Sequence, residues 1–258
     1  NPLYENSDVT DILGITQYTP PETAIMGGDV KGQLQAVGIL ISDEERIENL
    51  NSEYEELRKF RYFKTEKLDG TSFTAYLKNG QFGVCSRTLN YKQPNDDVDY
   101  NNMNVYWKMA KKYDLENKMR EFQFMYNLGN FAIQGELVGE NIQKNIYKLK
   151  GQQICFYNAF NIDSQEYWDY ETFIKIINEM GLQTVPILDT NFELPEHALD
   201  LLEEADRTTT VFGNNPKQLI EGFVYVAKGE IPTTIRITRA SYKRLSFKAK
   251  SRTFDMNK

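Results

Sequence analysis

The dipeptide Asn79-Gly80, which lies between two β-rich runs, constrains the fold of this chain more than any other feature. Both residues tolerate positive φ, so they suit the two-residue turn of a β-hairpin between residues 72–78 and 81–87. A third β-rich run, residues 61–67, ends at Lys67, where a glycine turn begins. A strand end of this kind can present its side chain to a cleft.

The rest of the chain alternates helical and strand patterns. Ser42-Asp43-Glu44-Glu45 is a capping-box pattern that predicts a helix extending to about Lys59. Further helices are expected over 103–126, 165–180 and 197–206, and strands over 131–138, 153–162, 222–227, 234–238 and 245–250. The pattern predicts an α+β fold with a mainly antiparallel β core.

Composition divides the chain into a lead-in and one large domain. Residues 1–35 are rich in Gly, Pro and Thr and are expected to form an extended lead-in rather than a core element. Residues 36–258 are long enough to bury a sizeable core. Because the chain starts with Asn1 rather than Met, we expect it to be part of a longer protein.

Charge and residue usage exclude several classes of function. The net charge of −7 argues against a general nucleic-acid coat, although the basic residues of 236–252 allow a local phosphate-binding groove. The single histidine, His197, rules out histidine triads and zinc sites. Cys85 and Cys155 lie among apolar residues, which indicates reduced, buried thiols and an intracellular protein. No apolar run reaches membrane-spanning length.

Lys67 is the candidate nucleophile. An amine attacks phosphorus only when it is deprotonated, and an ordinary lysine with a pKa of about 10.4 is almost fully protonated at neutral pH. Nearby positive charge lowers such a pKa, so we expect Lys248, Lys250 and a bound divalent cation to activate Lys67. The same cations would neutralise charge on a phosphate.

Two glutamates in apolar strand patterns are candidate binding groups. Glu136 lies within residues 131–139, and Glu221 begins the strand of residues 222–227. A carboxylate in an apolar setting is costly unless it is paired or metal-bound. The pair suits ribose hydroxyls or the waters of a magnesium ion, and a strand-end surface position is an equally plausible reading for each alone.

These segments together resemble the ordered motifs of the covalent nucleotidyltransferases, which include RNA ligases, DNA ligases and mRNA capping enzymes. Lys67-Leu68-Asp69-Gly70 is similar to motif I, Arg87 to motif Ia, Glu136 to motif III, residues 156–162 to motif IIIa, Glu221 to motif IV and residues 246–250 to motif V. The strongest resemblance is to ATP-dependent RNA ligases that seal nicks. Residues 11–21 and 42–46 resemble the subgroup with an N-terminal OB domain, which would precede the lead-in.

The resemblance implies a nucleotidyltransferase domain with antiparallel sheets, flanked by helices, around an ATP cleft. It implies that Lys67 attacks the α-phosphate of ATP and carries AMP as a covalent adduct. The other implied roles are these: phosphate contacts from Lys248 and Lys250; ribose contacts from Arg87 and Glu136; adenine contacts from Phe160 and the backbone near Glu66 and Leu68; and an Mg²⁺ or Mn²⁺ site at Glu136, Glu221 and Asp69. Phe156 competes with Phe160 for the adenine face.

The implied substrate is the 5′-phosphate and 3′-hydroxyl of a nicked duplex RNA or RNA/DNA hybrid, handled by a monomer. A DNA ligase or mRNA guanylyltransferase is the alternative enzyme, but both normally place an OB domain after motif V, and few residues follow Lys250. A non-catalytic nucleic-acid-binding module that uses the basic stretch 236–252 is the alternative of a different class.

Overall fold

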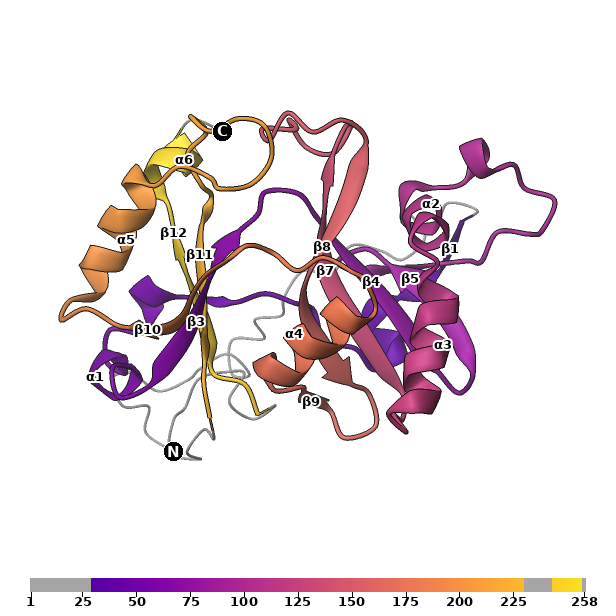
Figure 1. Ribbon diagram of the computed structural model, residues 1–258, viewed down its shortest axis with the longest axis horizontal. Helices are drawn as coiled ribbons and strands as arrows, with labels where there is room; N and C mark the ends of the chain where they lie inside the picture. The colour runs from indigo at the N-terminus through magenta and orange to yellow at the C-terminus, as the bar shows by residue number, and fades with distance from the viewer. Residues whose placement is uncertain (1–28, 230–242, 257–258) are drawn as a thin grey trace, which may run out of the picture.

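Two β-sheets form the framework of the protein in a computed structural model that describes residues 29–229 and 243–256 (Figure 1). The larger sheet has seven strands in the order β1-β6-β5-β4-β7-β8-β9, and all its neighbouring strands are antiparallel. Its strands are β1 (Val30–Gln33), β4 (Thr71–Lys78), β5 (Gln81–Cys85), β6 (Leu89–Tyr91), β7 (Phe131–Gly139), β8 (Gln152–Asn161) and β9 (Glu166–Tyr167).

The smaller sheet has five strands in the order β10-β3-β11-β12-β2, and only the β12–β2 pair is parallel. Its strands are β2 (Glu45–Arg46), β3 (Arg61–Lys67), β10 (Ile187–Glu193), β11 (Gly222–Ala227) and β12 (Ser246–Lys250). The helices are α1 (Tyr54–Leu57), α2 (Val105–Lys112), α3 (Leu115–Met125), α4 (Tyr170–Glu179), α5 (Ala198–Arg207) and α6 (Arg252–Met256). These sheets confirm the predicted α+β class with an antiparallel core.

Each sheet buries one face under helices, as alternating strand residues require. Helices α2, α3 and α4 supply apolar side chains to the core of the larger sheet, and α5 packs against β11 and β12 (Figure 1). Along β3, Tyr62 belongs to the core beneath α5, whereas Phe63 belongs to the core of the larger sheet. Strand β3 therefore has both faces buried. Every helix in the described ranges is too short or too polar to cross a membrane.

The predicted hairpin is confirmed, and it is joined to the smaller sheet by a very short crossing. Asn79 and Gly80 have φ values of 50° and 73°, and Lys78 pairs with Gln81 across the turn. Strand β3 ends at Lys67 in the smaller sheet, and β4 begins at Thr71 in the larger one. Only three residues, Leu68 to Gly70, carry the chain from one sheet to the other. Lys67 therefore lies at the seam.

The helix predicted over residues 42–59 is wrong for most of its length. Glu45–Arg46 forms strand β2 beside β12, and Ile47–Asn49 is a 3₁₀ turn, so only Tyr54–Leu57 is α-helical. Pairing with a sheet edge satisfies the backbone there and overrides the local capping signal. The expected lead-in also differs, because Val30–Gln33 pairs with β6 and Leu34 is buried.

Other boundaries shift, and some elements were not foreseen. The segment 165–180 begins as strand β9, and its helix starts at Tyr170 after the Asp169 cap, whose carboxylate accepts a hydrogen bond from the Thr172 N–H at 2.9 Å. The helical pattern of 103–126 is split into α2 and α3 by Asp114, which has a φ of 51°. Strands β1, β6 and β10 were not predicted. The strand expected at 234–238 lies outside the described residues.

A β-bulge at Tyr157 interrupts the pairing of β7 and β8. Gln134 pairs with Asn158 and Gly135 pairs with Phe156, so Tyr157 is the extra residue without a partner on β7. Gly135 allows the close approach, because a Cβ there would lie 2.8 Å from the carbonyl oxygen of Cys155. The backbone of Phe156 also bonds to residues 183 and 185 of a separate segment, at 2.8 and 2.9 Å.

We expect Gly135→Ala to lower the free energy of unfolding by roughly 1–3 kcal/mol, because the added methyl group would force β7 and β8 apart. Urea denaturation would measure the change. Gly32→Ala on β1 is the matched control, since no atom lies within 4 Å of a Cβ placed there. Equal losses from the two substitutions would contradict the close-approach explanation.

Candidate active site

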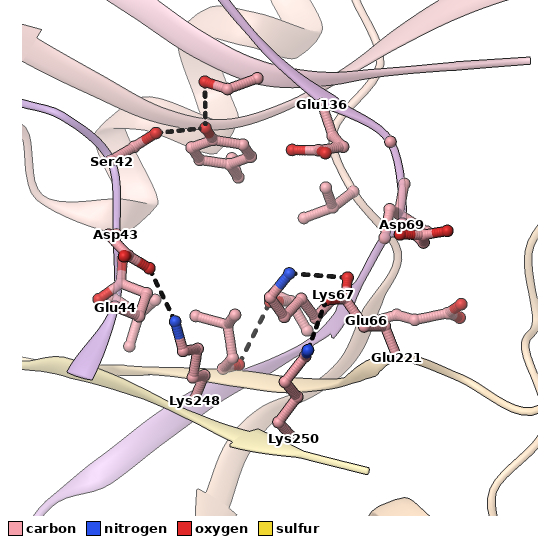
Figure 2. Close-up of a pocket in the computed structure, with 18 of the residues that line it drawn as sticks. Ser42, Asp43, Glu44, Glu66, Lys67, Asp69, Glu136, Glu221, Lys248 and Lys250 are labelled. Carbon is pink, nitrogen blue, oxygen red and sulfur yellow. Dashed lines mark hydrogen bonds and ion pairs between the residues drawn. The ribbon is translucent and has the colours of Figure 1, made fainter. Parts of the chain in front are cut away.

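A cavity of about 420 Å³ lies between the two sheets at the crossing from β3 to β4 (Figure 2). Residues from both sheets and from the segment before β2 line it. They include these polar side chains: Ser42, Asp43, Glu44, Arg46, Lys67, Asp69, Ser72, Arg87, Gln143, Glu136, Tyr157, Glu221, Arg244, Lys248 and Lys250. The cavity contains Lys67, Glu136, Glu221, Lys248 and Lys250, which come from distant parts of the sequence.

The register of the smaller sheet places three lysines on one face. Gly222 of β11 pairs with Lys67 on one side and with Lys250 on the other. Val224, two residues further, pairs with Lys248. Because strand residues two apart share a face, Lys248 and Lys250 both point to the side occupied by Lys67. The two-residue spacing of Lys248 and Lys250 therefore puts both side chains on the sheet face that carries Lys67.

Lys67 lies beside a carboxylate rather than a cation. Its Nζ is 2.7 Å from Oε2 of Glu221. Burial disfavours the ammonium, but the carboxylates of Glu221, Glu136 and Asp69 outweigh that effect and raise the pKa of Lys67. The prediction that Lys248, Lys250 and a bound divalent cation together lower this pKa stays a prediction. Positive charge must be added to the cavity before Lys67 loses its proton readily.

Lys248 and Lys250 also have carboxylate partners. The ammonium of Lys248 is 2.7 Å from Oδ1 of Asp43, and that of Lys250 is 2.6 Å from Oδ1 of Asp255 and 3.6 Å from Oε1 of Glu221. Arg87 is paired as well, with 2.9 Å between its Nη2 and Oδ2 of Asp43. These cations all lie at the cavity, as predicted.

Glu136 is the most strongly perturbed acid of the cavity. Burial raises its pKa to about 8; the charge of Lys67 opposes this rise, and Glu221 and Asp69 add to it. Strand β7 approaches the crossing closely, since a Cβ on Gly70 would collide with the carbonyl oxygen of Leu137 and lie 3.0 Å from Cγ of Glu136. Glycine at position 70 thus allows Glu136 to lie close to the crossing that follows Lys67.

Asp69, Glu136 and Glu221 are the three predicted metal ligands. Within residues 29–229 and 243–256, no three acidic, histidine or cysteine side chains are close enough to hold an ion together. Asp69, Glu136 and Glu221 nevertheless all act on the charge of Lys67. The carboxyl group of Glu136, whose pKa is raised, interacts electrostatically with those of Asp69 and Glu221. Such a set of oxygen donors suits a hydrated divalent cation that is bound through its waters.

Glu66 and Leu68 flank Lys67 but point elsewhere. The carboxylate of Glu66 accepts hydrogen bonds from the Thr210 hydroxyl and from the Val211 N–H, the latter at 3.1 Å, and burial raises its pKa. Leu68 packs in a small apolar cluster with Val138 and other residues. Both residues line the cavity, but these contacts turn the Glu66 carboxylate toward the loop that carries Thr210.

Phe160 does not line the cavity, which corrects its assignment to the adenine face. It is fully buried in a separate apolar cluster that also contains Tyr167, with 5.1 Å between the two ring centroids. Phe156, the alternative, is equally buried in the core of the larger sheet. Two described aromatic residues, Tyr157 and Tyr170, line the cavity. The Tyr157 hydroxyl is 2.6 Å from Oγ of Ser42 and 3.5 Å from Oγ of Ser72.

Tyr157, Asp43 and Arg244 line the cavity but were not among the predicted site residues. Arg244 is buried, and its guanidinium donates a hydrogen bond of 2.9 Å to Oδ1 of Asn158. One available signal was Gly135, because a glycine inside a strand pattern often marks a bulge, and bulges redirect side chains near active sites. No local signal identifies Asp43 or Arg244, whose partners are distant in sequence.

We expect the raised pKa of Glu136 to lower stability as pH rises. In the unfolded chain this group titrates at its ordinary value of 4.5, whereas in the folded protein it titrates at about 8, so the unfolded chain binds fewer protons between these values. Glu136→Gln should therefore gain stability relative to the wild type across that window, by roughly 1–3 kcal/mol in total.

Urea denaturation at pH 5, 6.5 and 8 would measure this gain. Glu140→Gln, at an exposed position on the same segment, should show no such trend. Parallel stability profiles for Glu136→Gln and the wild type would contradict the assignment.

Comparison with known proteins agrees with this geometry. The family model described as RNA ligase matches residues 61–250. No curated protein matched the chain. A mutant RNA ligase of Naegleria gruberi without ligand is 29% identical, with a TM-score of 0.74 over 97% of this chain and 66% of that chain. A mutant of that ligase with ATP and Mn is 29% identical, with a TM-score of 0.75 over 98% and 68% of the two chains.

The same ligase with pyrophosphate is 31% identical, with a TM-score of 0.72 over 97% of this chain and 67% of that chain. This chain thus spans about two thirds of the length of the N. gruberi ligase. The family match runs along the chain from β3 to β12, so it covers strands of both sheets. It also includes the three lysines that line the cavity, Lys67, Lys248 and Lys250. The chain therefore belongs to the RNA ligase family.

Proposed function

We propose that this protein is an ATP-dependent RNA ligase in which Lys67 accepts AMP from ATP. The observation that carries the proposal is the row formed by Lys67, Gly222 and Lys250, with Glu221 2.7 Å from the Lys67 amine. This row supports the proposal, because an amine, a carboxylate and a second ammonium group lie in one cavity. The N. gruberi ligase, to which the chain is similar, has been solved in mutant forms with ATP and Mn and with AMP and Mn.

In the proposed first step, the Lys67 amine attacks the α-phosphorus of ATP. The N–P bond forms, the bond from that phosphorus to the bridging oxygen breaks, and pyrophosphate leaves. The Lys67 proton has Glu221 as its nearest carboxylate, so Glu221 is placed to hold it as the amine becomes a nucleophile. Lys248 and Lys250, on the same sheet face, would stabilise the charge on the α-phosphate oxygens.

Glu136 and Glu221 are the residues proposed to hold Mg²⁺ or Mn²⁺ through its waters, with Asp69 nearby. The ion would supply the positive charge that offsets these carboxylates and lowers the pKa of Lys67. This role accounts for a cluster of acids whose effect in the protein alone is to keep the nucleophile protonated.

The adenine is proposed to stack on Tyr157, near the backbone of Glu66 and Leu68. The Tyr157 ring lines the cavity, and its hydroxyl is fixed by Ser42 and Ser72, which orient the ring. Stacking of a base on an aromatic ring contributes about 1–3 kcal/mol. Arg87, in the turn between β5 and β6, is proposed to contact the ribose or a nearby phosphate.

The later steps pass AMP to a 5′-phosphate end and join that end to a 3′-hydroxyl with release of AMP. We propose a nicked duplex RNA or RNA/DNA hybrid as the substrate and a monomer as the active form. We also propose that residues 36–258 are the nucleotidyltransferase domain and that an OB domain precedes residues 1–35 in the whole protein. These proposals rest on family membership and on the motif order described above.

Incubation of the protein with ATP and Mg²⁺ or Mn²⁺ should add one AMP, visible as an increment in intact mass. Lys67→Ala and Lys67→Arg should both abolish the increment. Arginine preserves the charge beside Glu221, but its guanidinium remains protonated and is not a nucleophile. An exposed control, Lys59→Ala, should still be labelled. A wild-type protein that gains no mass would refute the proposed chemistry.

Tyr157→Ala should raise the ATP concentration that half-saturates labelling by about fivefold to thirtyfold, because one stacking surface is lost. Tyr157→Phe should preserve most of the affinity, since the ring remains. Phe160→Leu should lower thermal stability but leave the half-saturating concentration unchanged, because that side chain lies outside the cavity. The reverse ranking of Tyr157→Ala and Phe160→Leu would restore Phe160 as the stacking residue.

A further inference from the structure

Asp43 bridges two cations that belong to different sheets. Its Oδ2 is 2.9 Å from Nη2 of Arg87, which follows β5 of the larger sheet. Its Oδ1 is 2.7 Å from Nζ of Lys248 on β12 of the smaller sheet. One carboxylate thus bridges a cation of each sheet at the cavity, and Figure 2 shows its contact with Lys248.

The segment that carries Asp43 is anchored by its neighbours. We call residues 42–46 the strap. Ser42 bonds to the Tyr157 hydroxyl at 2.6 Å, Glu44 accepts a bond from the Ser246 hydroxyl at 2.5 Å, and Glu45–Arg46 pairs with β12. The strap backbone is therefore held on both sides of Asp43, and the Asp43 side chain can change rotamer while the strap stays in place.

The ion pair of Asp43 with Arg87 is accessible to a competing anion, whereas the Lys248 side chain of the second pair is only 13% exposed. The side chains of Asp43 and Arg87 are 53% and 59% exposed, respectively. Ion pairs with this exposure are individually weak and are screened by salt. A polyphosphate, which carries more charge and more acceptor oxygens than one carboxylate, has the chemistry to displace Asp43 from both cations.

We propose that Asp43 is an internal anion that competes with the phosphates of ATP for Arg87 and Lys248. The inference rests on the proposed function, since it assigns these cations to the nucleotide. Asp43 then lowers the affinity for ATP. The phosphates of ATP must first displace the Asp43 carboxylate before they can bind Arg87 and Lys248. This competition makes the cavity selective for polyphosphates, because a singly charged anion displaces the Asp43 carboxylate less effectively.

The test compares Asp43→Asn with the wild type in single-turnover AMP labelling across a range of ATP concentrations. Asparagine keeps the shape but removes the charge, so the half-saturating ATP concentration should fall about threefold to tenfold, with the maximal rate unchanged within about twofold. Glu45→Gln is the matched control: it makes the same change in net charge two residues away, and the Glu45 carboxylate bonds to Asn49 and its neighbouring backbone. Its half-saturating concentration should change less than twofold.

A second variant tests the same contact. In an Arg87→Gln background, Asp43→Asn should give a smaller gain, because one of the contested cations is absent. If Asp43 instead positions Arg87 and Lys248 for the substrate, Asp43→Asn will raise the half-saturating concentration. That result, or no change, would overturn the proposal.

Failure of the proposed function is distinguishable from failure of this inference. If the wild type shows no labelling, calorimetric titration with inorganic pyrophosphate measures anion binding without chemistry. Tighter pyrophosphate binding by Asp43→Asn than by Glu45→Gln would support the competition even then, and equal binding would refute it. Thermal unfolding of each variant verifies that it is folded, and Asp43→Ser replaces Asp43→Asn if the asparagine variant is unstable.

Discussion

The partial burial of the Lys67 ammonium at the seam between two sheets is the constraint on which the rest of the site depends. An ammonium that is partly removed from water is costly without a partner, and Glu221, 2.7 Å away and directly before β11, supplies one. The three-residue crossing from β3 to β4 leaves Lys67 little freedom to move away. The glycine that ends this crossing, Gly70, also allows β7 to bring Glu136 close. Lys67, its neighbouring carboxylates and its flanking strands are therefore held in place together.

Charge in the cavity is balanced internally. Lys67, Lys248, Lys250 and Arg87 each have a carboxylate within hydrogen-bonding distance. This balance stabilises the side chains that would grip a phosphate, and it explains why the pKa of Lys67 is raised rather than lowered. An incoming nucleotide and cation would have to exchange partners with these groups. The acids therefore determine the charge of the cavity as much as the cations do.

The aromatic wall of the cavity depends on a local irregularity. A regular strand would place Phe156, Asn158 and Phe160 on one face, but the bulge at Tyr157 changes the alternation. Phe156 then faces the helices, Phe160 lies in a separate cluster, and Tyr157 reaches the cavity. Gly135 and the segment around residues 183–185 make the bulge possible, the first by its missing Cβ and the second by satisfying the Phe156 backbone.

The sequence by itself determined the features that depend on neighbouring residues. These are the Asn79-Gly80 turn, the strand that ends at Lys67, the spacing of Lys248 and Lys250 on one face, and the placement of Glu136 and Glu221 in buried strands. Only the tertiary structure decided which carboxylate neutralises each cation, which aromatic ring faces the cavity, and that residues 42–46 form a strap instead of a helix. The physical reason is that ion pairs, bulges and sheet-edge pairing form between residues far apart in the chain. Their energy outweighs local propensity, and no local pattern encodes it.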